Sequence, residues 1–131
     1  MKINDTELEI INNYVIKSKQ ERIIWEFENP EKRKHMMMTR FSGPDILKSS
    51  CLQPVNYMSP DEMEKSLFRL NGVREVYFMG ESFIGNLSLK EAVKRANDGE
   101  ICIIYCGNGV GYYQGEECGG SPPRYLLIQK S

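Results

Sequence analysis

The stretch GEICIIYCGNGVGYYQGEECGGSPPRYLLIQ, residues 99–129, decides the fold of this chain. It holds the most apolar run of the sequence, residues 101–106, and a second apolar run, residues 124–129. A glycine-broken segment rich in tyrosine lies between them. Apolar runs of about four to eight residues bounded by turn signals predict buried strands, because helices need more length. We therefore place the centre of the core in these two strands.

Length and composition are those of an ordinary globular protein. The chain has 131 residues, 40% of them hydrophobic and 27% charged, and we assign residues 1–131 to one domain. Its 17 basic and 18 acidic residues give a net charge of −1, which disfavours general nucleic-acid binding. Apolar runs fall short of the roughly 18 residues that span a bilayer, and the N-terminal residues are too polar for a signal peptide. We expect a cytoplasmic protein with no nucleic-acid or membrane partner.

The cysteines favour reduced thiols over disulfides, because the chain is long, poor in cysteine and without a secretory signal. Zinc is the alternative, since three cysteines and the one histidine could supply four ligands: Cys102, Cys106, Cys118 and His35. Against zinc, the sequence has no C-x-x-C pair, and Cys102 and Cys106 lie inside an apolar run as small hydrophobic residues would. We expect no metal and no cofactor.

The first thirty residues predict a helix and then a short strand. In residues 4–19, Leu8, Ile11 and Val15 form the apolar stripe of an amphipathic helix. In residues 22–28, apolar and polar residues alternate, which predicts a strand with Trp25 filling the core. A binding anchor is the alternative role for this tryptophan, because tryptophan is common at interface hot spots.

A second helix is predicted over residues 31–41, with Pro30 at its start. The basic residues 32–35 then occupy its first turns, where the helix dipole disfavours cations. This placement indicates either a solvated face or an anionic neighbour, such as a carboxylate or a partner. Met36, Met37 and Met38 are expected to fill gaps in the core.

Two further helices carry local start signals. Ser59 precedes a proline and is followed by Glu62 three residues later, which predicts a capping box. Gly72 ends that helix in the usual left-handed conformation. Ser88 is the expected cap of the other helix, residues 89–97.

The strand pattern completes the expected fold class. Residues 73–79 are rich in β-forming types and predict a strand that a helical crossover joins to residues 101–106, in parallel. Residues 80–86 are expected to be a loop, and residues 107–111 a short antiparallel link. The fold class expected is α+β: one mixed, mainly antiparallel sheet of about four to five strands packed by three to four helices.

The glycines Gly107, Gly109 and Gly111 follow a strand, as in a phosphate-binding loop, but no helix start follows them. Such a loop needs a helix N-terminus behind the glycines, so a hairpin or bulge is favoured. His35 is the one histidine, and no serine or cysteine stands in a recognisable nucleophile context. We therefore expect a protein that is not an enzyme.

A cluster of tyrosine and acidic residues is the candidate partner-binding segment: Tyr112, Tyr113, Gln114, Glu116 and Glu117. Tyrosine loses little entropy on ordering, and paired glutamates can meet a basic partner. We expect this glycine-rich segment to be exposed. The alternative is that its tyrosines pack over the edge of the sheet.

Two stretches carry a family resemblance: ENPEKRKHMMMTRFSG, residues 28–43, and GYYQGEECGGSPPRYLLI, residues 111–128. With them, the layout resembles the cytosolic immunity proteins of bacterial contact-dependent inhibition and related polymorphic toxin systems. The resemblance implies a single α+β domain without catalytic residues, which occludes the active site of a cognate toxin domain, often a nuclease. Immunity proteins for nucleases are often clearly acidic, and the near-neutral charge here is a departure.

The leading hypothesis is therefore an immunity protein whose partner is a cognate toxin domain. Two alternatives stay open. One is a small enzyme or ligand-binding domain that holds a nucleotide or phosphate at residues 107–111. The other is an RNA-contacting protein that uses residues 32–34 and Arg40.

Overall fold

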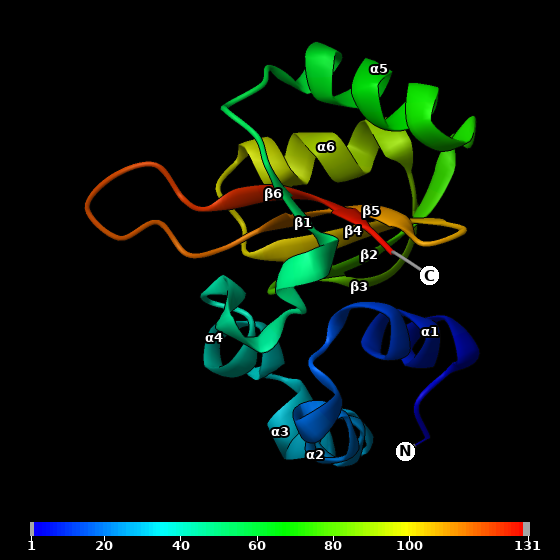
Figure 1. Cartoon of the computed structure of the whole chain (residues 1–131), viewed down its shortest axis with the longest axis vertical. Helices are drawn as coiled ribbons and strands as arrows, with labels where there is room; N and C mark the ends of the chain where they lie inside the picture. Colours follow the sequence, from blue (N-terminus) through cyan, green and yellow to red (C-terminus); the bar gives the residue numbers. More distant parts are fainter. Residues whose placement is uncertain (1, 130–131) are drawn as a thin grey trace.

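The computed structural model describes residues 2–129 and has an α+β fold built on one antiparallel sheet (Figure 1). The strands are β1 Leu52–Pro54, β2 Glu75–Gly80, β3 Ile84–Ser88, β4 Cys102–Gly107, β5 Val110–Gln114 and β6 Arg124–Ile128. The helices are α1 Asp5–Tyr14, α2 Lys17–Glu28, α3 Pro30–Arg33, α4 Met36–Arg40, α5 Pro60–Asn71 and α6 Leu89–Asn97, with the short 3₁₀ helices η1 Pro44–Ile46 and η2 Ser49–Cys51. The expected class is confirmed, although the described chain has six strands and six α-helices, more than predicted.

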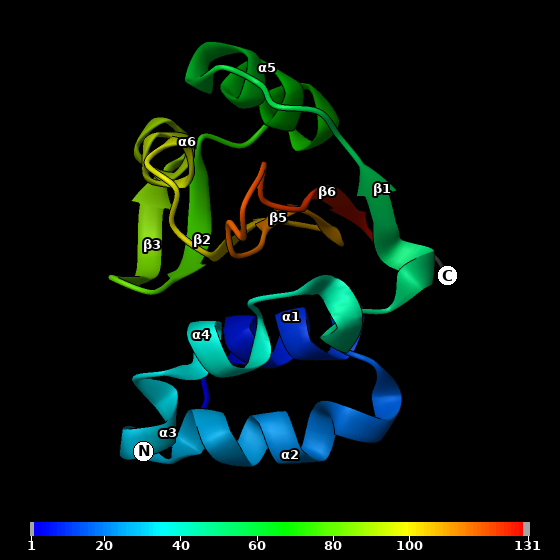
Figure 2. The ribbon, with the colours of Figure 1, turned by 90° about the vertical axis from the view of Figure 1, so that its left-hand side faces the viewer.

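The sheet lies between two helical layers (Figures 1 and 2). Helices α1 to α4 cover one face, and α5 and α6 cover the other. In β4, Ile103 and Tyr105 belong to the core on the α1 side, while Ile104 and Cys106 belong to the core beside α5 and α6. A strand covered on both faces needs apolar residues at every position, which explains the unbroken apolar run.

The strand order is β1-β6-β5-β4-β2-β3, and every neighbouring pair is antiparallel. The parallel pairing expected between β2 and β4 is wrong. The cause is β3, which lies within the expected loop and its flank and forms a hairpin with β2. Helix α6 therefore joins β3 to β4, and these two strands run in the same direction on either side of β2.

The strand predicted for residues 22–28 is wrong, because this segment is the second half of α2. Ile23 and Phe27 are buried and stand four residues apart, so they share one helix face. Trp25 points away from that face and is 50% exposed, so it does not fill the core. The alternating stretch is too short to distinguish the two-residue repeat of a strand from the 3.6-residue repeat of a helix.

The helix expected over residues 31–41 is divided into α3 and α4. Asn29 caps α3, its side chain accepting hydrogen bonds from the backbone N–H of Glu31 and Lys32. Met36 and Met37 are buried as predicted, whereas Met38 is 48% exposed.

The two helices with local start signals are confirmed. The Ser59 hydroxyl accepts from the backbone N–H of Glu62, and the Glu62 carboxylate accepts from the Ser59 backbone N–H. Gly72 ends α5 in the left-handed conformation, with φ of 66°. Ser88 caps α6 through the backbone N–H of Glu91. Within residues 2–129, no helix combines the length and apolar character that a membrane crossing requires.

Candidate partner-binding site

The tyrosines of the predicted partner-binding segment lie inside the molecule. Tyr112 and Tyr113 have no exposed surface, and Gln114 is 2% exposed, so the expected exposure is wrong for these three residues. They belong to β5, a central strand between β4 and β6. The Tyr113 hydroxyl donates to the backbone carbonyl of Phe41 at 2.7 Å, and burial raises its pKa. The glycine-rich segment that was expected to be exposed therefore forms a buried inner strand of the sheet.

Gln114 fastens the sheet to the C-terminal end of α6. Its amide nitrogen donates to the carbonyls of Ala96, at 2.7 Å, and Glu100, at 3.0 Å. Its amide oxygen accepts from the Tyr112 hydroxyl at 2.9 Å. Helix ends leave carbonyls without intrahelical donors, and a buried end must find partners elsewhere. Gln114 and Tyr112 are therefore framework residues for the surface beside them.

The acidic pair Glu116 and Glu117 stands at the start of a long arm between β5 and β6, which projects from the body of the molecule (Figure 1). The base of this arm is fixed. The backbone N–H of Gly115 donates to the Pro123 carbonyl at 2.9 Å, and that of Glu116 donates to the Ser42 carbonyl at 2.7 Å. Glu117 and the residues up to 121 are exposed beyond this point. Exposure is therefore as expected for Glu117, while Glu116 is half-buried.

Glu117 also lines a surface hollow of about 250 Å³, called here the partner hollow. The hollow is bounded by the segment before α5, the end of α6 and the arm. Its lining residues are Tyr57, Met58, Met63, Ala96, Asn97, Asp98, Gly99, Gln114, Glu117, Ser121, Pro122 and Arg124. Residues far apart in the sequence thus meet at one place on the surface.

Tyr57 is the aromatic residue of the partner hollow and is 60% exposed. Its hydroxyl donates to the Asn97 side-chain oxygen at 3.0 Å, and the Arg124 guanidinium carbon lies 5.3 Å from its ring centroid. These two contacts hold the ring in place while leaving most of it open to solvent. The sequence offered little signal for Tyr57, because it stands in the irregular segment before α5.

The partner hollow carries a net negative charge. Asp98 and Glu117 are both exposed, and Arg124 is the one cation that residues 2–129 contribute to the lining. Asp98 is the C-cap of α6, and the C-terminal end of a helix adds partial negative charge. The chemistry of the partner hollow therefore suits a basic side chain of another protein.

The glycine loop of residues 107–111 is a hairpin connection with a bulge, as favoured from the sequence. Gly107, Asn108 and Gly109 have positive φ. The Gly109 N–H donates to the Tyr105 hydroxyl at 3.2 Å, and its carbonyl accepts from the Gln129 N–H at 2.8 Å. The loop leads into β5, so no helix dipole stands behind it.

Two residues of the basic run, Arg33 and Lys34, meet carboxylates of the chain itself, while Lys32 and His35 are exposed, so each of the two readings holds for part of the run. Arg33 donates two hydrogen bonds to Glu7, which is 1% exposed, and Lys34 lies 3.5 Å from Glu31. Burial on its own would raise the pKa of Glu7, but the hydrogen bonds from Arg33 and Tyr77 and the charge of Arg33 outweigh it and lower this pKa. Arg33 is therefore a structural residue.

The cysteines are free thiols, three of them buried: Cys51, Cys102 and Cys106, with Cys118 exposed. Burial raises the pKa of Cys106 to about 11 and raises that of Cys102 further. Protonated, enclosed thiols are poor nucleophiles. Within residues 2–129, no group of three or more histidine, cysteine or acidic side chains is placed to hold a metal ion.

Comparisons of the chain with protein-family models, curated proteins and solved structures find no match.

Proposed function

We propose that this chain is a cytosolic immunity protein, which binds a cognate toxin domain and occludes its active site, with a nuclease as the class of toxin. The proposal is supported by one observation above all, the partner hollow, where exposed Tyr57 stands beside Asp98 and Glu117. The resemblance of the sequence to immunity proteins agrees with a binding role.

The aromatic ring supplies the contact area. Tyrosine is common at interface hot spots because it offers a large amphipathic surface with few rotatable bonds. Tyr57 is already restrained by Asn97 and Arg124, so it loses little additional entropy when a partner covers it.

The acidic side chains supply charge complementarity. Nucleic acid is polyanionic, so an enzyme that cuts it presents basic side chains to the phosphates. Asp98 and Glu117 can pair with such side chains, steering the encounter and excluding unsuitable partners. The local negative charge serves this role even though the whole chain is near neutral.

Hydrogen bonds around the partner hollow hold its walls in place. Gln114 fixes the end of α6, and the hydrogen bonds of Gly115 and Glu116 fix the base of the arm. The arm itself reaches beyond the body of the molecule, which suits a segment that enters or covers a cleft (Figure 1).

The test is a binding titration with the purified toxin domain encoded next to this chain, together with an assay of toxin activity. We expect a tight complex and loss of toxin activity at equimolar inhibitor. Tyr57→Ala and Glu117→Lys should each weaken the complex about tenfold or more, because a hot-spot truncation costs about 1–2 kcal/mol or more.

Glu21→Lys is the matched control for charge. Glu21 is exposed on α2, on the other side of the sheet, and the substitution makes the same charge change. Equal weakening by Glu21→Lys would show that net charge, and not the partner hollow, governs binding. Absence of any complex at micromolar concentrations would refute the proposal.

A further inference from the structure

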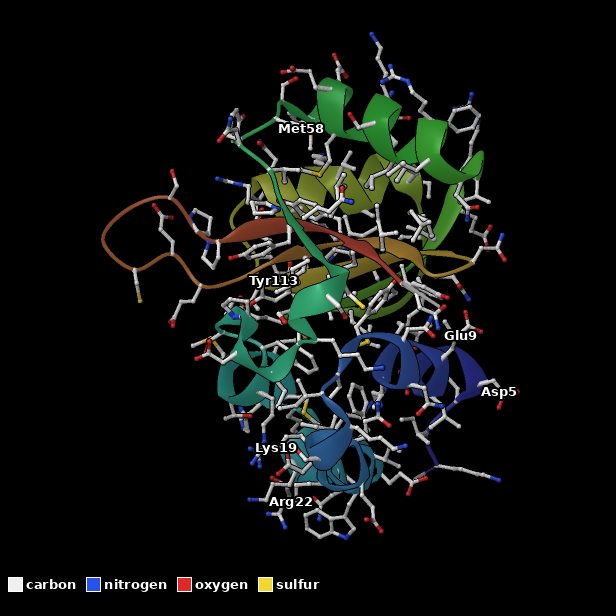
Figure 3. The ribbon with its side chains drawn as sticks, in the orientation of Figure 1. Asp5, Glu9, Lys19, Arg22, Met58 and Tyr113 are labelled. Carbon is white, nitrogen blue, oxygen red and sulfur yellow. The ribbon has the colours of Figure 1, made fainter. Side chains whose placement is uncertain are left out.

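A groove between α2 and the α3–α4 pair gathers basic side chains on the side of the sheet opposite to the partner hollow. It encloses about 450 Å³, and we call it the arginine pocket. Its lining residues are Arg22, Glu26, Glu31, Lys32, His35, Thr39 and Arg40. Figure 3 shows Arg22 on the outer side of the N-terminal helices and Met58, which lines the partner hollow, across the sheet from it. Small-ligand sites commonly measure about 300–1,000 Å³.

A buried carboxylate holds two guanidinium groups in this pocket. Glu26 is 4% exposed and accepts from Arg40 at both oxygens, at 2.8 and 2.6 Å. It also accepts from Arg22 Nε at 3.1 Å. Two positively charged groups, one from α2 and one from α4, are thus fixed in the groove before any ligand arrives, which lowers the entropy cost of binding.

These guanidinium groups keep unused donors. Counting acceptors within residues 2–129, Arg22 Nη1 and Nη2 and Arg40 Nη1 make no hydrogen bond. Arg40 remains partly exposed, and the Arg22 side chain is 58% exposed. Both side chains line the groove, so these nitrogens are the donors that it offers to a ligand.

Lys32 and His35 add two more donors, and the pocket lining stays positive. Lys32 and His35 are exposed and have no carboxylate partner in the described part of the chain. Arg22, Lys32 and Arg40 outnumber the lining carboxylates, Glu26 and Glu31. The Glu31 carboxylate lies 3.5 Å from the ammonium group of Lys34, a residue that does not line the pocket. The pocket is thus suited to an anion with several acceptor oxygens.

We propose that the arginine pocket binds the phosphate group of a small molecule, whose oxygens accept from Arg22, Arg40 and Lys32. A planar carboxylate has two oxygens, and one guanidinium fork can donate to both of them. Donors from separate side chains instead match an oxyanion with three oxygens, and guanidinium groups suit phosphate. This binding site is separate from the surface assigned to the toxin.

A small molecule is favoured over RNA because the cations next to the pocket already contact carboxylates of the chain. RNA binding needs a basic stripe that meets successive phosphates. Here Arg33 is taken by Glu7, and Lys34 lies beside Glu31, so the basic run does not extend the pocket along the surface. One local cluster of donors suits one phosphate group.

The only tryptophan of the chain provides a signal for binding. Trp25 is half exposed, and the Arg22 guanidinium carbon lies 4.9 Å from its ring centroid. A phosphate bound by Arg22 places negative charge near the indole and so changes its surroundings. We expect saturable changes of tryptophan fluorescence when inorganic phosphate or glycerol phosphate is added at constant ionic strength.

Calorimetric titration of the same full chain measures the stoichiometry directly, and the expected value is about one phosphate per chain. Arg22→Gln and Lys32→Gln should each raise the dissociation constant about tenfold, because each removes a charge-assisted hydrogen bond. Lys90→Gln, at an exposed residue of α6, makes the same charge change and should leave the dissociation constant within about twofold. Thermal unfolding shows whether each variant is folded.

Three outcomes would overturn the proposal. The first is no heat and no fluorescence change with phosphate up to about 100 mM, a concentration far above useful affinities. The second is equal weakening by Lys90→Gln, or an equal response to sodium chloride. The third is a single-stranded oligouridylate that binds more tightly than glycerol phosphate, with a salt dependence that indicates several phosphate contacts.

Discussion

Both terminal nitrogens of Arg33 donate hydrogen bonds to the Glu7 carboxylate, with N···O distances of 3.1 and 2.6 Å, and so connect α3 to the start of α1. Glu7 also accepts from the Tyr77 hydroxyl at 2.6 Å, which connects the pair to β2. The first helix, the third helix and the sheet thus share one buried carboxylate. This network holds the N-terminal helical layer against the sheet.

Removing Arg33 should leave that carboxylate buried without its cation. We expect Arg33→Gln to lower the free energy of unfolding by about 3 kcal/mol, the range for breaking a buried ion pair from one side. Lys34→Gln is the control, since Lys34 makes an exposed contact of 3.5 Å and such pairs contribute about 0–1 kcal/mol. Urea unfolding measures both. Equal effects would contradict a structural role for the Glu7–Arg33 pair.

Acid should destabilise the fold through Glu7 and Glu26. The pKa of each lies below the ordinary 4.5, for Glu26 mainly because Arg40 donates to it, and for Glu7 because Arg33 and Tyr77 outweigh burial. Below about pH 4.5 the unfolded chain therefore binds more protons than the folded chain, and stability falls as the pH falls. We expect the decline in unfolding free energy between pH 5 and pH 3 to be shallower in Glu7→Gln, by circular dichroism at each pH. An unchanged slope would exclude Glu7 as a cause.

Replacing Tyr14 with phenylalanine should raise the stability of the fold. Its hydroxyl is buried and, within residues 2–129, has no hydrogen-bond partner. Tyr14→Phe removes an unsatisfied polar group, so we expect a gain of about 1 kcal/mol. Tyr113→Phe is the matched control, because its hydroxyl donates to the Phe41 carbonyl and its loss should cost about 1–2 kcal/mol. Thermal unfolding of the two variants should therefore move in opposite directions.

Gly115 should not tolerate a side chain. A Cβ there would lie 2.7 Å from the Ser42 carbonyl oxygen, the Pro123 ring and the Tyr113 hydroxyl. Gly115→Ala should cost about 1–3 kcal/mol, as overpacking does. Gly120→Ala, where a Cβ would meet nothing within 4 Å, should change stability by less than about 0.5 kcal/mol. Equal unfolding midpoints would show that the base of the arm can open.

The register of α2 can be tested with its two aromatic residues. Phe27 is buried and Trp25 is half exposed, although both would face the core together in a strand. Phe27→Ala should cost about 3–5 kcal/mol and Trp25→Ala less than about 1 kcal/mol. A similar large loss from both would support the strand that the sequence suggested.

Features that depend on residues close together in the sequence, such as helix caps, could be predicted from the sequence. Ser59 with Glu62, and Ser88 with Glu91, satisfy helix ends through bonds three residues apart, so the sequence located both helices. Burial of β4 was also predictable, because an unbroken apolar run has few other places to lie.

Most of the errors concern relations between distant segments, and one concerns a short local pattern. Tyr112 and Tyr113 lie in a glycine-rich segment, and only pairing with β4 and β6 makes that segment an inner strand. Trp25 stands in a stretch too short to distinguish alternation from helical spacing. The partner hollow unites Tyr57, Asp98 and Glu117, which no spacing rule connects.

The strand order has a consequence for how this chain acquires its shape. Within residues 2–129, strand β1 pairs only with β6, Leu52 facing Leu127, although the segments stand far apart in the sequence. A nascent chain that has reached only Gln114 holds β1 without its neighbour and β5 with one open edge. Closing contacts of long sequence separation is slow. During synthesis, the sheet therefore stays incomplete and open to mispairing until residues 124–128 emerge.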